Sequence, residues 1–503
     1  MSAGDAQNEV GRREAELRAT RRENLAALVA RGADPYRTTR YPVTAHAREL
    51  GERFAALEAA AGPSAERFAL AGRLMALRKH GKNVAFADLW DRSGKLQLYV
   101  RADAVGEEAF ARFDLLDRGD LVGVQGPLFR TKMGELTLRV ESLEPLAKAI
   151  APIPELWGGL QDVETRYRQR YLDLLMNEEV REVFIARSRI VAELRRFLDA
   201  RGFLEMETAV LLGVAGGATA RRFETHCNAL DAKLELRIAT ELALKRLIVG
   251  GLERVYEIGR IFRNEGIDTT HNPEFTMLEL YAAYWSVAEM MEFNEELIAH
   301  LARFARGGEE LVVGGRPVSF GRPFARIAYL EALERWGALS RAELFDPEGA
   351  LRIEDRLGIP RSPTHAHALD KIFERVAESH LLAPTFVYDM PLVLSPLAKK
   401  KPDDPELVER YELFASGFEL SNAFTELNDP EDQRARFAAQ VEERRSGDDE
   451  VPEADWDFVR ALEYGMPPTA GIGIGIDRLV MLLTEQRSVR DVILFPLRRP
   501  LGR

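Results

Sequence analysis

An arginine and a glutamate precede a turn-rich segment, and an aromatic residue and a second glutamate follow it, at spacings that suit the binding of a charged ligand. The first pair is Arg263 and Glu265, which share one face of a predicted strand. On the return stretch, Phe275 and Glu279 share a face because strand side chains alternate. The segment from Gly266 to Asn272 is rich in Gly, Asp, Thr and Asn, which predicts a loop joining two strands. Buried charges are costly unless something pairs with them, so we expect this hairpin to line a site for a charged ligand.

A glycine-rich strand follows about two hundred residues later in the chain. Gly471, Gly473 and Gly475 alternate along it, so one face lacks side chains and a flat ligand or a backbone can approach. Arg478 then lies at the start of the predicted helix. An isolated Arg-x-x-Glu or Gly-x-Gly pattern carries little information, but the two stretches in this order are specific.

The two stretches resemble motifs 2 and 3 of class II aminoacyl-tRNA synthetases. Residues 262–279 contain F-R-N-E, a short loop and H-N-x-x-F-x-x-x-E, and residues 471–478 contain G-x-G-x-G-x-x-R. The wider strings R-N-E-G-I-D, H-N-P-E-F-T-M-L-E-L-Y and G-I-D-R-L are similar to those of bacterial-type class II lysyl-tRNA synthetases.

The resemblance implies that these parts hold ATP in a bent form. Arg263 would bridge the substrate carboxylate and the α-phosphate, while Glu265 would orient the adenine and Phe275 would stack on it. Arg478 would contact the far phosphate and the other face of the adenine. The amino acid's own carboxylate attacks, so catalysis rests on positioning and on neutralising developing charge. The implied ATP-binding residues are Arg263, Glu265, His271, Asn272, Phe275, Glu412, Glu419, Gly475 and Arg478, of which Arg263 and Arg478 are catalytic.

A second predicted hairpin carries acidic residues. Tyr411–Phe414 and Phe418–Glu426 are predicted strands around a turn at Ala415–Gly417. The resemblance implies that Glu412 and Glu419 bind metal, and a few oxygen ligands suit Mg²⁺ held mainly by phosphates and water. Without the resemblance, two glutamates on a hairpin would be interpreted as surface charges.

The resemblance also implies that further carboxylates line the pocket for the amino-acid substrate. Three carboxylates and no spare arginine make a pocket for a substrate with two amino groups, which indicates lysine. Aspartyl-type relatives have an arginine where this chain has Glu426, so that position distinguishes the substrates. The implied lysine-binding residues are Gly217, Glu241, Arg263, Glu279, Tyr281, Asn422 and Glu426.

The bulk properties are those of a globular chain of several domains. The 503 residues suggest three domains, and 46% of them are hydrophobic. No apolar run approaches the length of a membrane span, and the single cysteine, Cys227, excludes an internal disulfide. We therefore expect a cytoplasmic protein with no membrane partner. A formal net charge of −12 argues against indiscriminate nucleic-acid binding, but a local basic patch can still contact tRNA.

The N-terminal third is predicted to contain a helical extension over residues 1–66 and a small barrel over residues 67–148. The helix Asn8–Arg31 has a basic side, which is either a solvated face or a contact with the tRNA backbone. Five short alternating strands, with a helix between the third and fourth, predict an OB fold. Such barrels present aromatic and polar side chains to single-stranded bases. The resemblance implies that Phe86, Gln97 and Glu135 bind the anticodon, whereas Phe86 taken alone would be a core residue.

A linker at residues 149–165 leads to the predicted catalytic domain, residues 166–503. Helices and hairpins alternate there, so we expect an α+β protein whose antiparallel sheet is flanked by helices. The resemblance assigns motif 1 to about 182–209, as a homodimer interface that has Ala209 where the family has proline. That turn should be looser without the fixed φ of proline. Motif 2 is expected at about 256–281, a helical insertion at about 300–393 and motif 3 at about 471–483.

The resemblance therefore implies an ATP- and Mg²⁺-dependent homodimer that attaches lysine to tRNA(Lys). A second hypothesis transfers activated lysine to a protein, but relatives of that kind lack the barrel expected at residues 68–146. A third is a non-catalytic RNA-binding relative. Such relatives lose residues of motifs 2 and 3, whereas this chain keeps Arg263, Glu265, Phe275 and Arg478.

Overall fold

The computed structural model describes residues 3–55, 62–154, 159–218, 220–313, 315–445 and 453–500. The chain forms two compact units, Met1–Gly158 and Gly159–Arg503, each of which is described by itself. Among the described helices, none combines the length and the apolar character that crossing a bilayer requires.

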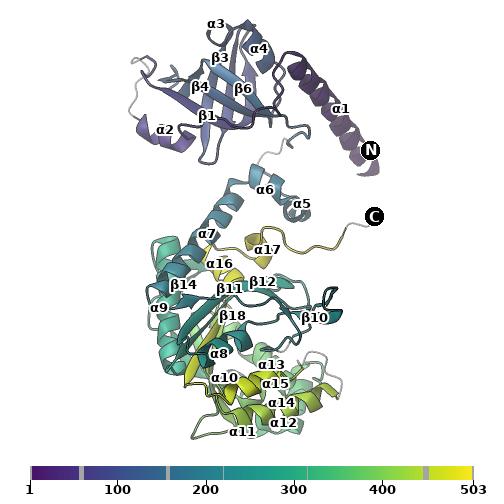
Figure 1. The fold of residues 1–503 in the computed structure, drawn as a ribbon, viewed down its shortest axis with the longest axis vertical. Helices are drawn as coiled ribbons and strands as arrows, with labels where there is room; N and C mark the ends of the chain where they lie inside the picture. The colour runs from purple at the N-terminus through teal and green to yellow at the C-terminus, as the bar shows by residue number, and fades with distance from the viewer. Residues whose placement is uncertain are drawn as a thin grey trace. The chain divides into compact units, whose positions relative to one another are not determined.

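The first unit is a closed barrel with an N-terminal helix (Figure 1). The order β1-β2-β3-β5-β4 closes through a β1–β4 pairing, and β6 adds to β4. Five strands in this order, with helices between β3 and β4, confirm the predicted OB fold. The elements are α1 (Ala3–Ala30), α2 (Ala47–Arg53), β1 (Arg67–Lys79), β2 (Val84–Trp90), β3 (Lys95–Arg101), α3 (Ala102–Val105), α4 (Glu107–Phe113), β4 (Leu121–Arg130), β5 (Leu136–Val140) and β6 (Ser142–Ala147).

Helix α1 has one side docked and one side exposed. Arg21 is buried, and its Nη1 donates to the carbonyl oxygens of Ala149 at 2.6 Å and Ala151 at 3.2 Å. On the exposed side, Arg18 pairs with Glu14 one turn away at 2.6 Å. Arg22 is exposed. The paired glutamate favours the solvated-face interpretation for part of this side, and the tRNA interpretation stays a prediction.

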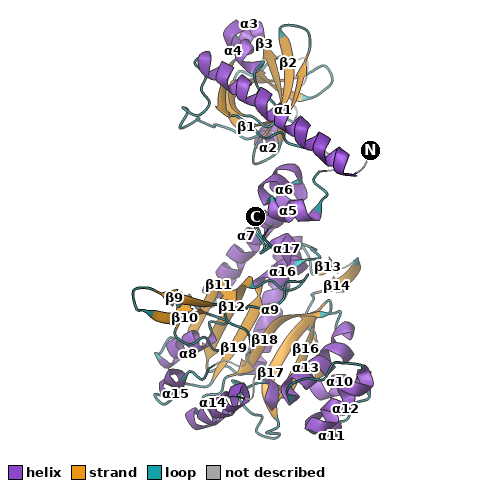
Figure 2. Ribbon diagram, turned by 90° about the vertical axis from the view of Figure 1, so that its right-hand side faces the viewer, coloured by secondary structure: helices purple, strands orange, loops and turns teal. Residues whose placement is uncertain are grey.

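The second unit is built on an eight-stranded sheet in the order β15-β16-β17-β18-β19-β12-β11-β7 (Figure 2). The pairs from β16 to β11 are antiparallel, whereas the outer pairs β15–β16 and β11–β7 are parallel. The predicted antiparallel sheet is therefore confirmed for its centre, and the sheet as a whole is mixed. Its strands are β7 (Leu204–Glu205), β11 (Arg254–Phe262), β12 (Glu274–Ala283), β15 (Ala325–Ala328), β16 (Thr385–Pro391), β17 (Leu407–Ala415), β18 (Phe418–Thr425) and β19 (Thr469–Gly475).

Smaller elements surround this sheet. The three-stranded sheet β8-β10-β9 consists of β8 (Leu211–Leu212), β9 (Glu224–Cys227) and β10 (Ala232–Leu236), and the hairpin β13–β14 covers Glu310–Val313 and Arg316–Ser319. The helices are α5 (Val163–Arg168), α6 (Arg170–Met176), α7 (Glu178–Asp199), α8 (Glu241–Val249), α9 (Val287–Arg306), α10 (Tyr329–Gly337), α11 (Arg341–Phe345), α12 (Pro347–Leu357), α13 (His365–Val376), α14 (Pro430–Arg445), α15 (Trp456–Leu462), α16 (Ile476–Leu483) and α17 (Val489–Val492).

The predicted helical insertion at about 300–393 is wrong at both ends. Helices α10–α13 cover its middle and lie at the β15–β16 side of the sheet (Figure 2). Residues 325–328 and 385–391 instead form β15 and β16 of the large sheet. Short apolar runs such as these do not distinguish a strand from a buried helix by periodicity alone, because their partners are distant in sequence. The linker predicted at residues 149–165 ends earlier than expected, because α5 begins at Val163.

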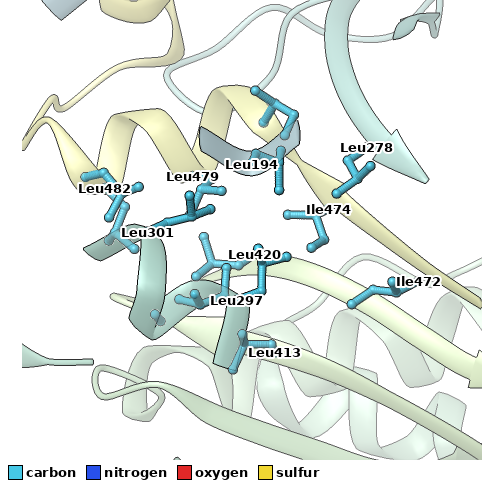
Figure 3. Packing of buried hydrophobic residues seen from close by; sticks show 14 of the residues in the cluster. Leu194, Leu278, Leu297, Leu301, Leu413, Leu420, Ile472, Ile474, Leu479 and Leu482 are labelled. Atoms are coloured by element: carbon cyan, nitrogen blue, oxygen red, sulfur yellow. The ribbon is translucent and has the colours of Figure 1, made fainter. Parts of the chain in front are cut away.

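Side-chain alternation gives the large sheet two unlike faces. One face carries Leu278 on β12 and Ile474 on β19, which pack against helices α7, α9 and α16 (Figure 3). The labelled residues of this core are Leu194, Leu278, Leu297, Leu301, Leu413, Leu420, Ile472, Ile474, Leu479 and Leu482. The neighbouring positions along β12 and β19 point to the other face, where the cavity lies.

Candidate active site

A cavity of about 520 Å³ opens on the face of the sheet opposite this core. It is lined by residues from β12, β17, β18, β19, the start of α8 and α16, and the loop between β11 and β12. Every site residue predicted in the second unit lines it: Gly217, Glu241, Arg263, Glu265, His271, Asn272, Phe275, Glu279, Tyr281, Glu412, Glu419, Asn422, Glu426, Gly475 and Arg478. The structure thus gathers the predicted residues in one place, while their individual roles stay predictions.

Two predicted residues lie in a loop instead of on a strand. Strand β11 ends at Phe262, and Arg263 and Glu265 follow it. The Arg263 N–H donates to the carbonyl of Pro273 at 2.9 Å, which closes the loop immediately beyond the last β11–β12 pair. The prediction that Arg263 and Glu265 share a strand face is therefore wrong. The Arg263 guanidinium nevertheless lies 5.4 Å from the centre of the Phe275 ring, so the loop brings two of the implied ATP-binding residues together.

The glycines of β19 make room for the chain's own side chains as well as for a ligand. A Cβ atom on Gly471 would lie 2.3 Å from Oε1 of Glu426 and 2.4 Å from the Tyr281 ring. One on Gly473 would lie 2.3 Å from the terminal methyl of Met277. The space that Gly471 and Gly473 leave open is thus approached by the chain's own side chains, while both glycines line the cavity. Gly475 has only the Arg478 side chain near it, at 3.8 Å.

Arg478 connects three elements at one end of the cavity. Its Nη2 lies 3.1 Å from Nε2 of His271, and its Nη1 donates to the carbonyl of Glu419 at 2.9 Å. Nδ1 of His271 lies 2.8 Å from Asp268. Burial acts to raise the pKa of Asp268, but hydrogen bonds from Thr270 and His271 lower it to about 2. A carboxylate, an imidazole and a guanidinium thus form a chain that holds Arg478 toward the cavity.

Carboxyl groups gather at the other end of the cavity. Glu279 is 4% exposed and accepts hydrogen bonds from the Thr240 N–H at 2.9 Å and the Tyr281 hydroxyl at 3.3 Å. Burial raises the pKa of Glu279 to about 7. Burial also raises the pKa of Glu426, although the Lys245 ammonium opposes that rise. Buried carboxyl groups with raised pKa values favour a cationic ligand, because a cation offsets their desolvation and mutual repulsion.

Sequence reasoning missed Lys245, which lies behind this acidic end. Its Nζ is 2.5 Å from Oε1 of Glu241 and also forms an ion pair with Glu426. Burial acts to lower the pKa of Lys245, but the two carboxylates outweigh it and raise that pKa. The i, i+4 spacing of Glu241 and Lys245 on a helix was the available signal for one of these contacts.

Sequence reasoning also missed Arg410, which joins two predicted residues. Its Nη2 lies 2.5 Å from Oε1 of Glu412, and its Nε donates to Oδ1 of Asn422 at 3.0 Å. It also donates to the carbonyl of Leu394 at 2.6 Å. Burial raises the pKa of Glu412 to about 7, against the opposing effect of Arg410. The period-2 spacing of Arg410 and Glu412 on one strand was the available signal.

The residues on both sides of Ala209 form hydrogen bonds, while the effect of alanine in place of proline on the rigidity of the turn stays a prediction. The backbone N–H of Thr208 donates to Oε2 of Glu257 at 3.1 Å, and its hydroxyl donates to the same oxygen at 2.7 Å. On the other side, the Arg237 N–H donates to the carbonyl of Val210 at 2.9 Å. The chain is therefore fixed on both sides of Ala209.

In the first unit, Gln97 and Glu135 contact each other and Phe86 lies outside the barrel core. Nε2 of Gln97 donates to Oε2 of Glu135 at 2.9 Å. Phe86 on β2 is half-buried and is not part of the barrel's apolar core. Its ring centre is 4.9 Å from that of Tyr99 on the neighbouring β3. The structure therefore favours a half-buried aromatic position outside the core over the core-residue interpretation, while anticodon binding stays a prediction.

Comparison with protein-family models identifies the class of protein. A model described as class II tRNA synthetases (D, K and N) matches residues 162–499, which is more than half of the chain. A second model, described as an OB-fold nucleic acid binding domain, matches residues 68–146. These matches coincide with the large sheet and the barrel.

Curated relatives match nearly the whole chain. A lysine–tRNA ligase of Moorella thermoacetica is 51% identical over 489 residues, covering 97% of this chain and 98% of the relative. A lysine–tRNA ligase of Carboxydothermus hydrogenoformans is 50% identical over 487 residues, covering 96% of this chain and 98% of the relative. A lysine–tRNA ligase of Aquifex aeolicus is 51% identical over 442 residues, covering 87% of this chain and 74% of the relative. The chain belongs to the lysine–tRNA ligase family of class II tRNA synthetases.

Proposed function

We propose that the protein activates L-lysine with ATP to lysyl-adenylate and transfers the lysyl group to the 3′ end of tRNA(Lys), releasing AMP and pyrophosphate. The observation that carries this proposal is the set of buried carboxyl groups at one end of the cavity, opposite the end that holds Arg478. A substrate with two ammonium groups matches the acidic end, and the polyphosphate of ATP matches the arginines.

The acidic end is proposed to bind both ammonium groups of lysine. Glu279 and Tyr281 are joined by a hydrogen bond and face the cavity from β12, and Glu426 faces it from the end of β18. Oε1 of Glu426 is buried and has no hydrogen-bond partner among the residues that the structure describes. An ammonium group would supply that partner. Gly217, Glu241, Arg263 and Asn422 complete the proposed lysine site.

Arg263 and Arg478 are proposed to bind different parts of the triphosphate: the α-phosphate, which is transferred with the adenosine, and the far phosphate, which leaves in pyrophosphate. Arg263 would contact both the lysine carboxylate and the α-phosphate, because it lines the same cavity as the acidic residues and its guanidinium lies beside the Phe275 ring. Arg478 would contact the far phosphate, with His271 beside it. Glu265, Asn272, Phe275 and Gly475 would hold the adenosine part. Neither arginine acts as an acid or base, so both accelerate the reaction through position and charge.

Glu412 and Glu419 fit a divalent cation that is held mainly by ATP. Both carboxyl groups line the cavity near Arg478, and Arg478 Nη1 lies 3.5 Å from Oε2 of Glu419. In the described parts of the chain, no group of three or more His, Cys, Asp or Glu residues forms a self-sufficient metal cage. Two carboxylates suit Mg²⁺, which usually retains waters and phosphate oxygens as ligands. The bound Mg²⁺ would neutralise phosphate charge.

The barrel is proposed to read the anticodon of tRNA(Lys), and the second unit to form a homodimer through motif 1. The half-buried Phe86 ring, which lies outside the barrel core, and the Gln97–Glu135 pair support the first proposal. Leu204 supports the second, because it is 51% exposed on the edge strand β7 of the sheet. We also propose that the protein acts in the cytoplasm, as expected from its sequence.

Replacing Phe86 by alanine should weaken tRNA charging and leave lysine activation unchanged. Stacking of one base on an aromatic ring contributes about 1–3 kcal/mol, which is about 5- to 150-fold in affinity. We therefore expect kcat/KM for tRNA(Lys) charging to fall by that factor, with lysine-dependent pyrophosphate exchange near wild type. Thermal unfolding of the same preparation controls for a cavity in the barrel. Unchanged charging would remove Phe86 from the anticodon site.

Lysine binding should weaken as the pH falls through about 7. The pKa of Glu279 is raised to about 7, so below that pH its carboxyl group is protonated and no longer pairs with an ammonium. The KM for lysine should rise toward about tenfold per pH unit below the inflexion, as expected for one titrating group. Pyrophosphate exchange between pH 5.5 and 8.5 measures this, and the KM for ATP in the same assays is the control. A lysine KM that is constant down to pH 5.5 would show that Glu279 does not pair with the substrate.

Charging of purified tRNA tests the whole proposal. Radiolabelled lysine should become attached to tRNA(Lys) in the presence of ATP and Mg²⁺, and it should not become attached to tRNA(Asp) or tRNA(Asn). Attachment should fail when the terminal adenosine of the tRNA is removed. Absence of lysyl-tRNA(Lys) with an active preparation of pyrophosphate-exchanging enzyme would contradict the transfer step.

A further inference from the structure

Lys245 provides an enclosed ammonium group immediately behind the acidic end of the cavity. Its side chain is 0% exposed and contacts both Glu241 and Glu426. The rings of Phe424 and Phe458 flank Nζ at 5.3 Å and 5.8 Å. Lys245 is not among the residues that line the cavity, whereas Glu241 and Glu426 are. A substrate would therefore contact the two glutamates and would not contact Lys245.

We propose that Lys245 is a positioning residue for substrate recognition: it holds Glu241 and Glu426 from behind, so that the free oxygen of Glu426 meets the ε-ammonium of the substrate. This inference rests on the proposed lysine activation and assigns a determinant of its specificity to a residue outside the cavity.

The geometry of Glu426 shows how one oxygen is left for the substrate. Oε2 forms the ion pair with Lys245. Oε1 is buried without a hydrogen-bond partner among the described residues. It faces the space that the missing side chain of Gly471 leaves open, because a Cβ there would lie only 2.3 Å away. Anchoring one oxygen fixes the carboxylate plane and so directs the other oxygen.

The charge balance of the acidic end also favours this role for Lys245. When all three are ionised, Glu241, Glu279 and Glu426 exceed by one the two ammonium groups of a bound lysine. The Lys245 ammonium offsets that excess. Arg263 does not serve this purpose, because it is proposed to face the substrate carboxylate and the α-phosphate. Removing a cation from among buried carboxyl groups favours their protonation, which would leave the substrate ammonium unpaired.

The charged groups that face Lys245 and Glu426 come from few elements. Helix α8 contributes Glu241, and β12 contributes Glu279 and Tyr281. The adjacent Arg246 is directed elsewhere, to Asp455 at 2.8 Å and to Asp457 at 3.3 Å. Strand β19 contributes Gly471, which has no side chain, to the lining of this part of the cavity. Lys245 is the cation that contacts both Glu241 and Glu426, so its loss would be felt first by the pKa values of the glutamates.

The test compares lysine binding by wild type, Lys245→Met and the control Arg246→Met. Lys245→Met should raise the KM for lysine at pH 7 about tenfold or more, with a smaller change in kcat, because it removes one partner of a buried charge pair. The inflexion of kcat/KM for lysine should move upward by about one pH unit or more. Arg246→Met removes a neighbouring charge from the same helix and should retain the wild-type inflexion. Calorimetric titration with lysine, without ATP, should show the same shift in affinity.

Two further comparisons separate the role of Lys245 from an effect on folding: a conservative variant, and the same substitution made in a Glu241→Gln parent. Lys245→Arg retains the positive charge and should keep the inflexion closer to wild type than Lys245→Met does. If Lys245→Met unfolds at neutral pH, the comparison is made between Glu241→Gln and the double variant Glu241→Gln/Lys245→Met, in which fewer carboxyl groups are left facing one another. An upward shift of the inflexion on adding Lys245→Met supports the inference in either background.

Two outcomes would overturn the proposed role of Lys245. A folded Lys245→Met variant, or the double variant relative to its parent, with an unchanged lysine KM and pH profile would show that Lys245 serves packing alone. A wild-type protein with no lysine-dependent exchange would contradict the proposed function and this inference with it. The first outcome alone leaves the proposed function intact.

Discussion

Replacing Glu426 by glutamine should raise the KM for lysine by about 30- to 4,000-fold, which corresponds to about 2–5 kcal/mol. Glutamine keeps the size of the side chain and removes the negative charge. The substrate ammonium would then be desolvated at a site where Glu426 is 1% exposed, without its counter-charge. The effect should lie mainly in KM, because the ammonium is equally charged in the ground state and in the transition state. Pyrophosphate exchange at varied lysine concentrations measures it.

Two comparisons make the Glu426 result specific. The KM for ATP should stay near wild type in Glu426→Gln, since the nucleotide end of the cavity is unchanged. Lysine methyl ester retains both ammonium groups, so its affinity as an inhibitor should fall in parallel with that of lysine. A folded variant whose lysine dependence matches wild type would assign recognition of the side chain to another carboxyl group.

Replacing Arg263 by alanine should lower kcat for adenylate formation by about 10²- to 10³-fold, the size found when one preorganised donor to a developing charge is removed. Arg263 is held in place by its Nε donating to the carbonyl of Ile238 at 3.3 Å and by the Phe275 ring. Arg263→Lys should recover only part of the loss, since an ammonium lacks the two-pronged guanidinium geometry. Single-turnover formation of lysyl-adenylate is the direct measurement.

Arg260 offers the matched control for Arg263. It lies on β11, three residues before Arg263, and its side chain is 46% exposed and 3.6 Å from Glu274. Exposed pairs contribute little, so Arg260→Ala should leave adenylate formation near wild type. Equal losses in the Arg260 and Arg263 variants would indicate a general effect on the hairpin instead of transition-state stabilisation.

Side-chain alternation predicted part of the cavity from the sequence, and the family resemblance implied most of its other residues. Phe275 and Glu279 were placed on one face by alternation, and the structure has both in the cavity. Prediction from alternation fails where the backbone pairing between β11 and β12 stops. Alternation extended past Phe262 put Arg263 and Glu265 on a strand, but the last paired residues are Phe262 and Glu274.

Contacts between distant segments could not be predicted in the same way. The Glu241–Lys245 spacing indicates an ion pair along a helix, but only the fold brings Glu426 to the same ammonium. Strands β15 and β16 are similarly defined by partners that are far apart in sequence, which periodicity within either segment does not reveal. The family resemblance supplied residue roles, and the structure supplied the charge that balances them.

Amino-acid-dependent ATP–pyrophosphate exchange across the twenty amino acids tests the central claim most directly. We expect rapid exchange with lysine alone. A pocket distinguishes a single methylene by about 1–3 kcal/mol, so ornithine should be weaker by about 10- to 200-fold. Arginine should also be far weaker than lysine. Exchange driven by aspartate or asparagine, in place of lysine, would contradict the assignment of the acidic end of the cavity to a substrate with two ammonium groups.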